Sequence, residues 1–403
     1  MSLGLCIKIL AEYKKGEIKM EVSQVYQIVN EAAKQTLGRE NPVQEDLGNI
    51  VDIGNEIFDN EAVDKWVKSL MNRIGKVQFV NRGYRSTAPS IMMDDWEFGS
   101  VMEKIRSEMP KATENESWNL TPGATYDPNM FYGSVARAKF YNKMTTFEVP
   151  ISLAPMQIKQ SFSSATQLNA FMSMLLNEVD KTMTVAFDDM SMRAINSMIG
   201  ETFWNAFNGG AITGPGTAKC INLLSRYNTL FGEELTAEAA LTNPAFLRFA
   251  TMEMDLMFSR LTKISTLFNI GGRERFTPQS LQHFVMLSNF KAAADIFLQS
   301  TTFHDNYTKL RAAEEVPFWQ GSGSGYEFSN ASKIYLKTPS GHDVEASGIL
   351  AILFDHEALG MHGYNNRTTS NWNPKAEFTN YWYKRDGRYF NDFDENFVVF
   401  YVA

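Results

Sequence analysis

The feature that most constrains the fold of this 403-residue chain is a long helical pattern between residues 163 and 199. Apolar residues return every three to four positions, as they do on one face of an α-helix. They are Leu168, Phe171, Met172, Leu175, Val179, Met183, Ala186, Met190, Ala194 and Met198. Ser163 or Ser164 could cap the helix and Gly200 could end it. At 1.5 Å per residue such a helix is roughly 50 Å long, so we expect a scaffold element with a methionine-rich core face.

The segments before this helix alternate between helical and irregular patterns. Residues 21–37 and 62–74 predict two amphipathic helices, each followed by glycine. Residues 38–60 are polar and predict an extended or loosely structured arm. Residues 76–84 predict a strand, and the alternation in residues 145–153 predicts another.

Residues 85–140 differ from the rest in carrying four prolines, many mixed charges and scattered large aromatic side chains. The segment is too rich in apolar residues for a plain disordered linker. We expect an insertion that packs against something else, such as another subunit.

The second half of the chain predicts a mixed lobe and closing strands. Asn243-Pro244 is typical of a helix start, and a further helix is expected over residues 289–298. Apolar strands are expected at residues 283–287 and 348–354. The end predicts strands at 377–384 and 397–402, with Asp386-Gly387 as a hairpin turn.

Composition excludes several classes of protein. The net charge of -8 disfavours a protein that binds nucleic acid specifically. The 13% aromatic content suits a large core or subunit interface. Cys6 and Cys220 form neither a disulfide framework nor a zinc motif, and synthesis in a reducing cytosol is expected. No apolar run is long enough for a membrane span, and the N-terminus does not read as a signal peptide.

The start of the chain suggests a translated leader. Lys-Gly-Glu within residues 14–20 can be encoded by a ribosome-binding sequence, followed by a short spacer and Met20. The hypothesis is that Met20 is the authentic start and that residues 1–19 are leader. The alternative is that Lys-Gly-Glu is an ordinary polar tripeptide.

The best candidates for catalytic or metal-binding residues form one cluster. Asp355-His356-Glu357, with His362, follows the buried strand at 348–354, where α/β enzymes often place catalytic groups. No H-E-x-x-H pattern accompanies it, and a solvated polar turn is the preferred interpretation. Gly321–Gly325 lacks the spacing of a dinucleotide site. We therefore expect no catalytic residue, no metal site and no cofactor.

Several stretches carry a resemblance to a known family. They are residues 64–75 (DKWVKSLMNRIG), 348–355 (GILAILFD), 378–383 (FTNYWY) and 396–402 (NFVVFYV). With the order of the expected elements, the chain resembles the tailed-bacteriophage major capsid proteins of the Hong Kong 97-like fold. Among these it is most similar to the phi29-like podovirus branch.

The resemblance implies an α+β fold with an N-terminal arm, an extended β-hairpin loop, a long spine helix, a peripheral β-sheet and an axial α/β domain. The implied division of the chain is as follows: 1–60 N-terminal arm, 61–84 part of the peripheral domain, 85–150 extended loop, 151–200 spine helix, 201–345 axial domain, 346–403 closing strands of both domains.

The implied function is a structural protein, not an enzyme, that assembles into pentamers and hexamers of an icosahedral or prolate shell. The expected partners are further copies of the chain, packaged double-stranded DNA without sequence specificity, and scaffold, portal and decoration proteins, but no membrane. The expected location is the virion capsid, after synthesis in the host bacterial cytoplasm. Aromatic residues dominate interface hot spots. The expected inter-subunit contacts are therefore Trp96, Trp118, Phe131 and Tyr132, unless these pack within one subunit.

Two alternatives remain. An encapsulin-like compartment shell would have the same fold and a protein cargo. A hydrolase or metal enzyme would use His356 and His362.

Overall fold

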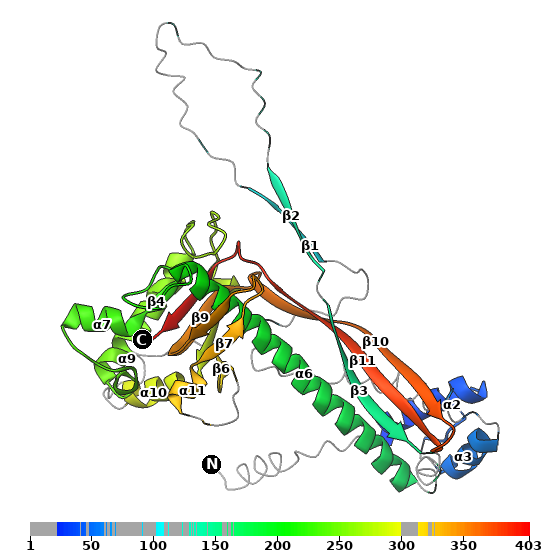
Figure 1. Ribbon diagram of the computed structural model, residues 1–403. Helices are drawn as coiled ribbons and strands as arrows, with labels where there is room; N and C mark the ends of the chain where they lie inside the picture. Colours follow the sequence, from blue (N-terminus) through cyan, green and yellow to red (C-terminus); the bar gives the residue numbers. More distant parts are fainter. Residues whose placement is uncertain are drawn as a thin grey trace, which may run out of the picture.

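A computed structural model describes most of the chain (Figure 1). The described residues are 22–40, 42–45, 48–59, 62, 65–66, 69, 91, 102–108, 112, 123, 129, 131, 133, 135–142, 144–154, 159, 163, 165–299, 313–320, 325 and 327–403. One long helix runs between a long, narrow sheet and a mixed lobe, and a β-hairpin projects beyond the body (Figure 1).

The chain's first described elements are two helices, α2 (Val22–Leu37) and α3 (Ile50–Asp59). The expected helix at 21–37 is confirmed, and it ends at Gly38, whose φ is 71°. The prediction of a loosely structured arm over residues 38–60 is wrong, because helix α3 occupies nearly half of this segment. Ile50, Ile53 and Ile57 recur at helical spacing and are buried in a core shared with α2.

The long helix α6 spans Ala165–Phe207, so its 43 residues extend about 65 Å. The prediction that Gly200 ends this helix is wrong, because Gly200 lies inside it. A Cβ on Gly200 would stand 3.1 Å from Leu336 Cδ1 and 3.3 Å from Thr338 Cγ2. The glycine therefore provides room for strand β7 (Ile334–Lys337) to approach the helix.

A three-stranded antiparallel sheet lies along α6, in the order β10 (Leu359–Asn373), β11 (Phe378–Asn391) and β3 (Thr145–Leu153). The expected strand at 145–153 is confirmed. The prediction of a hairpin turn at Asp386-Gly387 is wrong, because both residues lie within strand β11. Asp386 is buried, where it pairs with Arg367 and accepts a hydrogen bond from Thr146 Oγ1 at 2.6 Å.

The mixed lobe is built on a five-stranded sheet whose strands come from distant parts of the chain. Across the sheet they are β4 (Cys220–Asn222), β12 (Phe397–Tyr401), β9 (Ile349–Asp355), β5 (Gln282–Leu287) and β6 (Glu314–Val316). The outer pairs, β4–β12 and β5–β6, are parallel, and β9 is antiparallel to both neighbours. The expected strands at 283–287, 348–354 and 397–402 are thus confirmed.

Both faces of this sheet are buried. One face packs against α7 (Leu223–Phe231), α9 (Pro244–Leu261) and α10 (Ser288–Gln299). The other packs against the C-terminal part of α6 and the two-stranded sheet of β7 and β8 (Asp343–Ala346). Short helices complete the lobe: α8 (Ala237–Ala240), η3 (Gln279–Leu281) and α11 (Phe328–Ala331). The helix starting at Asn243-Pro244 and the helix at 289–298 are confirmed.

Helix α6 joins the two halves of the molecule. Its N-terminal part shares a core with α2, α3 and β3 through buried residues such as Val179 and Met183. Its C-terminal part lies in the core of the mixed lobe through Met198, Ile199 and Phe203. The same helix thus places the long sheet and the mixed lobe relative to one another.

Candidate functional site

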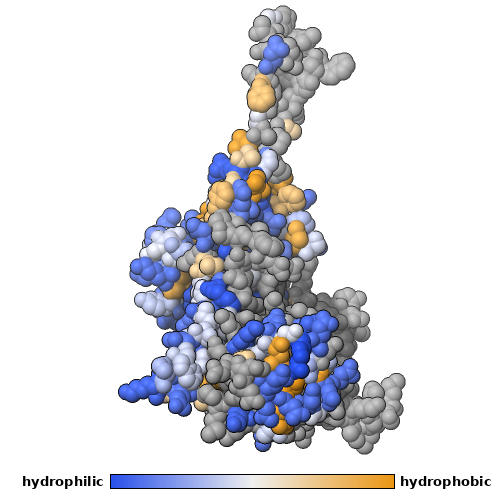
Figure 2. Space-filling view, turned by 90° about the vertical axis from the view of Figure 1, so that its right-hand side faces the viewer, coloured by the Kyte–Doolittle hydropathy of each residue, from blue (hydrophilic) through white to orange (hydrophobic). Residues whose placement is uncertain are grey.

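The projecting hairpin consists of β1 (Met102–Ser107) and β2 (Ala136–Tyr141), paired antiparallel. Alternate residues of a strand point to opposite faces, so this ribbon has two faces of different chemistry. Lys104, Arg106 and Lys139 lie on the inner ribbon face, which turns towards the body and is partly buried. Arg137 is on the same face, but it is exposed and pairs with Glu108. Ile105, Ala138 and Phe140 lie on the outer ribbon face together with Glu103, Ser107 and Ala136, and this face is exposed. Hydrophobic surface is visible where the hairpin leaves the body in Figure 2.

The inner ribbon face binds acidic side chains beside strand β11. Asp392, Asp394 and Glu395, in the connection from β11 to β12, form what we call the acidic loop. Lys104 Nζ lies 2.7 Å from Asp392 Oδ2, and Lys139 Nζ lies 2.7 Å from Asp392 Oδ1.

Further ion pairs extend this contact. Lys139 Nζ lies 2.7 Å from Asp394 Oδ2, and Arg106 pairs with Glu395 and with Glu357 in the turn after β9. These charges hold the base of the hairpin to its own subunit.

Burial makes this contact more than a surface salt bridge. The side chains of Asp392 and Glu395 are only 2% and 3% exposed. Burial alone would raise the pKa of Asp392, but hydrogen bonds and charges from Lys104 and Lys139 outweigh it and lower the pKa below its ordinary value. The buried carboxylate is thus ionised at neutral pH, and removing its partners would leave an uncompensated charge.

The four aromatic residues predicted as inter-subunit contacts fall mostly outside the description. Trp96, Trp118 and Tyr132 lie outside the described residues, so the structure does not place them. Phe131 comes five residues before the start of β2 and is 91% exposed. The resemblance implied an extended β-hairpin loop within residues 85–150, but the sequence pattern did not locate its strands, although charged and apolar residues alternate in Lys104–Arg106 and Ala136–Phe140.

The predicted histidine cluster takes a different form from the one that the sequence suggested. His356 Nδ1 lies 2.9 Å from Nε2 of His283 on β5, whereas His362 on β10 stacks on Phe390. Burial lowers the pKa of His283, and the neighbouring His356 adds to the effect. Among the described residues, no group of three or more histidine, cysteine or acidic side chains is arranged to hold a metal.

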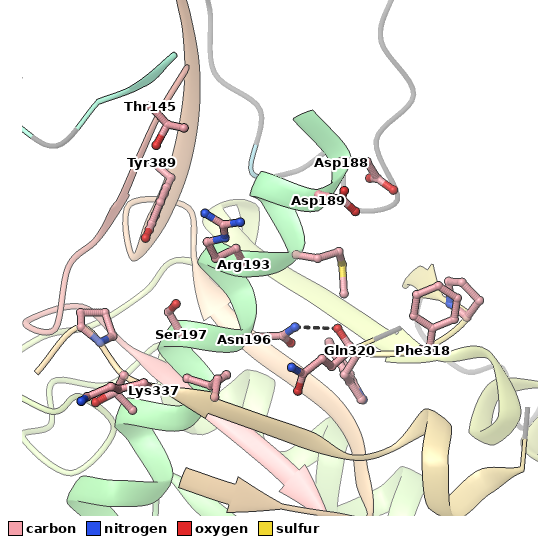
Figure 3. A pocket seen from close by; sticks show the side chains of 16 residues that line it. Thr145, Asp188, Asp189, Arg193, Asn196, Ser197, Phe318, Gln320, Lys337 and Tyr389 are labelled. Carbon is pink, nitrogen blue, oxygen red and sulfur yellow. Dashed lines mark hydrogen bonds between the residues drawn. The ribbon is translucent and has the colours of Figure 1, made fainter. Parts of the chain in front are cut away.

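A cavity of about 900 Å³ lies between α6, the segment after β6 and strand β7 (Figure 3). Its charged lining consists of Asp188, Asp189 and Arg193 on α6 and Lys337 on β7. Asn196 Nδ2 donates to the Trp319 carbonyl oxygen at 2.6 Å across its floor. No histidine or cysteine occurs among the described residues that line it, and its mixed charges do not suggest acid–base chemistry.

The chain was compared with known protein families. A model of the Phi29-like phage major capsid proteins matches residues 25–401. The chain belongs to this family. It is therefore a phage major capsid protein, a structural component of the virion, and the encapsulin-like and hydrolase alternatives are not favoured.

Other comparisons add less. No curated protein matches this capsid protein by sequence. Several solved phage capsid structures are similar to it, two of which follow. One is the capsid structure of Staphylococcus phage Andhra, with 9% identity and a TM-score of 0.45 over 78% of this chain and 83% of that chain. The other is the asymmetric unit of the bacteriophage PhiM1 mature capsid, with 8% identity and a TM-score of 0.42 over 80% and 87%.

The architecture of this major capsid protein confirms the expected fold class. The α+β structure has the order implied by the Hong Kong 97-like resemblance: N-terminal segment, projecting hairpin, long helix, mixed lobe and closing strands. Among the described residues, no helix combines the length and apolar character needed to cross a bilayer.

Proposed function

We propose that this capsid protein assembles head to tail into pentamers and hexamers that tile an icosahedral or prolate shell around the phage genome. The match to the Phi29-like family over residues 25–401 carries the proposal. Repeated heterologous contacts close into rings when the rotation between neighbours closes, so one chain can build both kinds of ring.

The contacts between neighbours would come first from the extended loop at 85–150. Its described part projects from the body, where a neighbouring subunit can be reached (Figure 1). In this proposal Trp96, Trp118, Phe131 and Tyr132 contact the neighbour. The N-terminal segment at 20–60 would contribute through the exposed surfaces of α2 and α3, since their apolar faces belong to their own subunit's core.

The proposed division of the chain follows from the same function. Residues 61–84 and 151–200 and the closing strands would form the peripheral domain, with α6 as its spine. Residues 201–345, with strands from 346–403, would form the axial domain that points towards the ring axes.

The proposed partners outside the shell are scaffold, portal and decoration proteins, together with DNA packaged without sequence specificity. The net charge of -8 suits an enclosing shell that does not adhere to its DNA. Synthesis would take place in the host bacterial cytoplasm, and the role would be structural without catalysis. Metal analysis and a hydrolase assay of purified protein test that last point, and turnover lost on substituting His356 would contradict it.

Negative-stain electron microscopy of the purified, concentrated protein tests assembly directly. Closed shells or hexameric rings are expected, with head proteins of the same phage added where a scaffold is needed. Monomers under both conditions would contradict the proposal. The Trp118→Ala variant should assemble less without unfolding, and normal shells from it would exclude Trp118 as a contact.

A further inference from the structure

The cavity between α6, residues 317–320 and β7 is large enough to hold a ligand. Its volume of about 900 Å³ falls in the range of about 300–1,000 Å³ that is typical of ligand sites. Its lining combines apolar side chains, such as Met192 and Phe318, with polar side chains of both charges. A site of this composition can bind a partner and also orient it.

One side chain that lines the cavity has an unused acceptor. Asn196 is only 7% exposed, and its Nδ2 donates to the Trp319 carbonyl oxygen, but its Oδ1 accepts no hydrogen bond from any described residue. An amide oxygen has two acceptor sites, and leaving a buried one without a donor costs free energy. Because Asn196 lines the cavity (Figure 3), a ligand with an N–H donor can supply the missing bond.

Strand β7 presents an unpaired edge beside this acceptor. Within the described part of the chain, β7 pairs with β8 alone. The backbone of Tyr335 points away from β8, because its N–H donates to Gln320 Oε1 and its carbonyl oxygen accepts from Gln320 Nε2 at 2.8 Å. Strand residues alternate, so the backbone N–H and carbonyl groups of Lys337 point to the same unpaired edge. Such an edge is a template for one more strand.

The charges of the lining indicate the chemistry of the occupant. Arg193, on the same face of α6 as Asn196, forms no ion pair with the described residues, and neither does Lys337 or Asp189. Asp188 already interacts within the chain. Two uncompensated cations against one carboxylate leave a local excess of positive charge. An acidic side chain on the ligand compensates that excess.

We propose that this cavity binds an extended, acidic peptide segment of another protein of the phage head, which adds as a strand to the unpaired edge of β7. The backbone of the peptide pairs with Lys337 and donates an N–H group to Asn196 Oδ1, and an acidic side chain lies near Arg193. In strand addition, backbone hydrogen bonds supply affinity and the flanking side chains supply specificity.

The source of the peptide rests on the proposed function, because a shell protein meets the other proteins of the head during assembly. The acidic loop of a second copy is not available for this contact, since it is paired with the base of its own hairpin. The segment therefore comes from a different protein.

A peptide array tests the proposal with a defined probe. Overlapping peptides of about twelve residues, covering this chain and the other head proteins of the same phage, span the edge of a strand such as β7 several times over. We expect acidic peptides from other head proteins to bind the unassembled subunit. No binding, or binding by peptides of this chain alone, would overturn the inference.

Charge reversal at one lysine tests where such a peptide binds. Lys337→Glu should weaken binding of the strongest peptide by about tenfold or more, because it places like charges together. Lys375→Glu makes the same change in the exposed turn between β10 and β11, away from the cavity. It should bind within about twofold of the unchanged chain, since distant surface charges are screened. Equal effects of the two variants would contradict the proposed site.

The strand edge itself is tested by Lys337→Pro and Lys337→Gln. Both remove the charge, but only proline removes the N–H donor, and an edge strand tolerates proline where that N–H points away from the ladder. Both variants should unfold at the urea concentration of the unchanged chain. Lys337→Pro should bind the peptide at least about threefold more weakly than Lys337→Gln, as expected for one lost hydrogen bond. Equal binding would exclude strand addition.

Shell formation separates this inference from the proposed function. Shells formed by the unchanged chain, together with an array on which no peptide binds, would refute the inference alone. Peptide binding by a chain that forms no shells with its head proteins would refute the proposed function and uphold the peptide site.

Discussion

Asp392 is the residue on which the hairpin's attachment depends most, since its carboxylate accepts hydrogen bonds from two lysines on different strands. Asp392→Asn should cost about 3 kcal/mol of unfolding free energy, because it leaves the mostly buried ammonium of Lys104 with weaker compensation. This is the lower end of the range for buried pairs, since Lys139 is partly exposed and screened by solvent. Urea unfolding of unassembled subunits measures the loss.

The pH dependence of this variant has a defined sign. The pKa of Asp392 is lowered in the fold, so its contribution is complete above the ordinary aspartate pKa of about 4 and is lost as the pH falls through the folded value. The stability difference between the unchanged chain and Asp392→Asn should therefore shrink below about pH 4. Asp343→Asn on the exposed edge of β8 is the matched control and should change stability by less than about 0.5 kcal/mol. Equal losses for both variants would contradict the role of Asp392.

Gly387 is required by the approach of α6 to β11. A Cβ there would lie 2.5 Å from Met190 Cε and 3.3 Å from Phe147 Cε2. Gly387→Ala should therefore destabilise the chain by about 1–3 kcal/mol through overpacking. Shortening the neighbour should relieve it, so the cost of Gly387→Ala measured in a Met190→Ala background should be smaller. An additive double-mutant cycle would show that Met190 is not the obstacle.

At the scale of elements, helix α9 shows how local sequence determines a boundary. The Asn243 side chain accepts hydrogen bonds from the backbone N–H groups of Ala245 and Phe246, at 2.8 and 3.2 Å, and Pro244 needs no partner at the first position. Asn243→Ala should cost about 1 kcal/mol in thermal or urea unfolding, and Asn243→Asp should retain the cap. Equal stability of the alanine and aspartate variants would exclude the cap as a stabilising feature.

Elements with local signals of this kind could be predicted from the sequence. The alternation in β3, the apolar run of β9 and the glycine after α2 each identify a structure within a few residues. Strand β10 had no such signal, because much of it is polar and its fifteen residues are held by pairing with β11. Asp386-Gly387 carried a misleading signal, because the same two residue types are typical of a hairpin turn. Here Asp386 forms a buried ion pair, and Gly387 leaves room for helix α6.

The candidate site was predictable only in outline. The alternation within each strand of the hairpin indicates two faces, but no local pattern shows which one meets the body. Lys104 and Asp392 are 288 positions apart in the sequence, and Lys139 and Asp392 are 253 apart. Similarly, His283 joins His356 only because β5 and β9 are neighbours in the sheet. Such contacts follow from strand order, which the sequence pattern of single elements does not specify.

At the scale of the whole molecule, α6 is the structural link between the long sheet and the mixed lobe. Arg193 lies on the exposed side of this helix. It stands between Met190, which packs against residues of the long sheet, and Ile195, which is buried in the core of the mixed lobe. A proline there removes a helical hydrogen bond and clashes with the preceding turn, at a cost of about 3 kcal/mol or more. The bend would also separate two cores that now share one rigid helix.

We therefore expect Arg193→Pro to divide the unfolding of the unassembled subunit. Calorimetry of the unchanged chain should show one cooperative transition, because neither core can open without disturbing α6. Arg193→Pro should show two transitions, and the one at lower temperature should correspond to the core of α2, α3 and β3, which is the smaller cluster. Arg193→Ala removes the same side chain and keeps the helix, so it should unfold in a single step. A single transition in the proline variant would mean that contacts between the lobes, and not the helix, couple their stability.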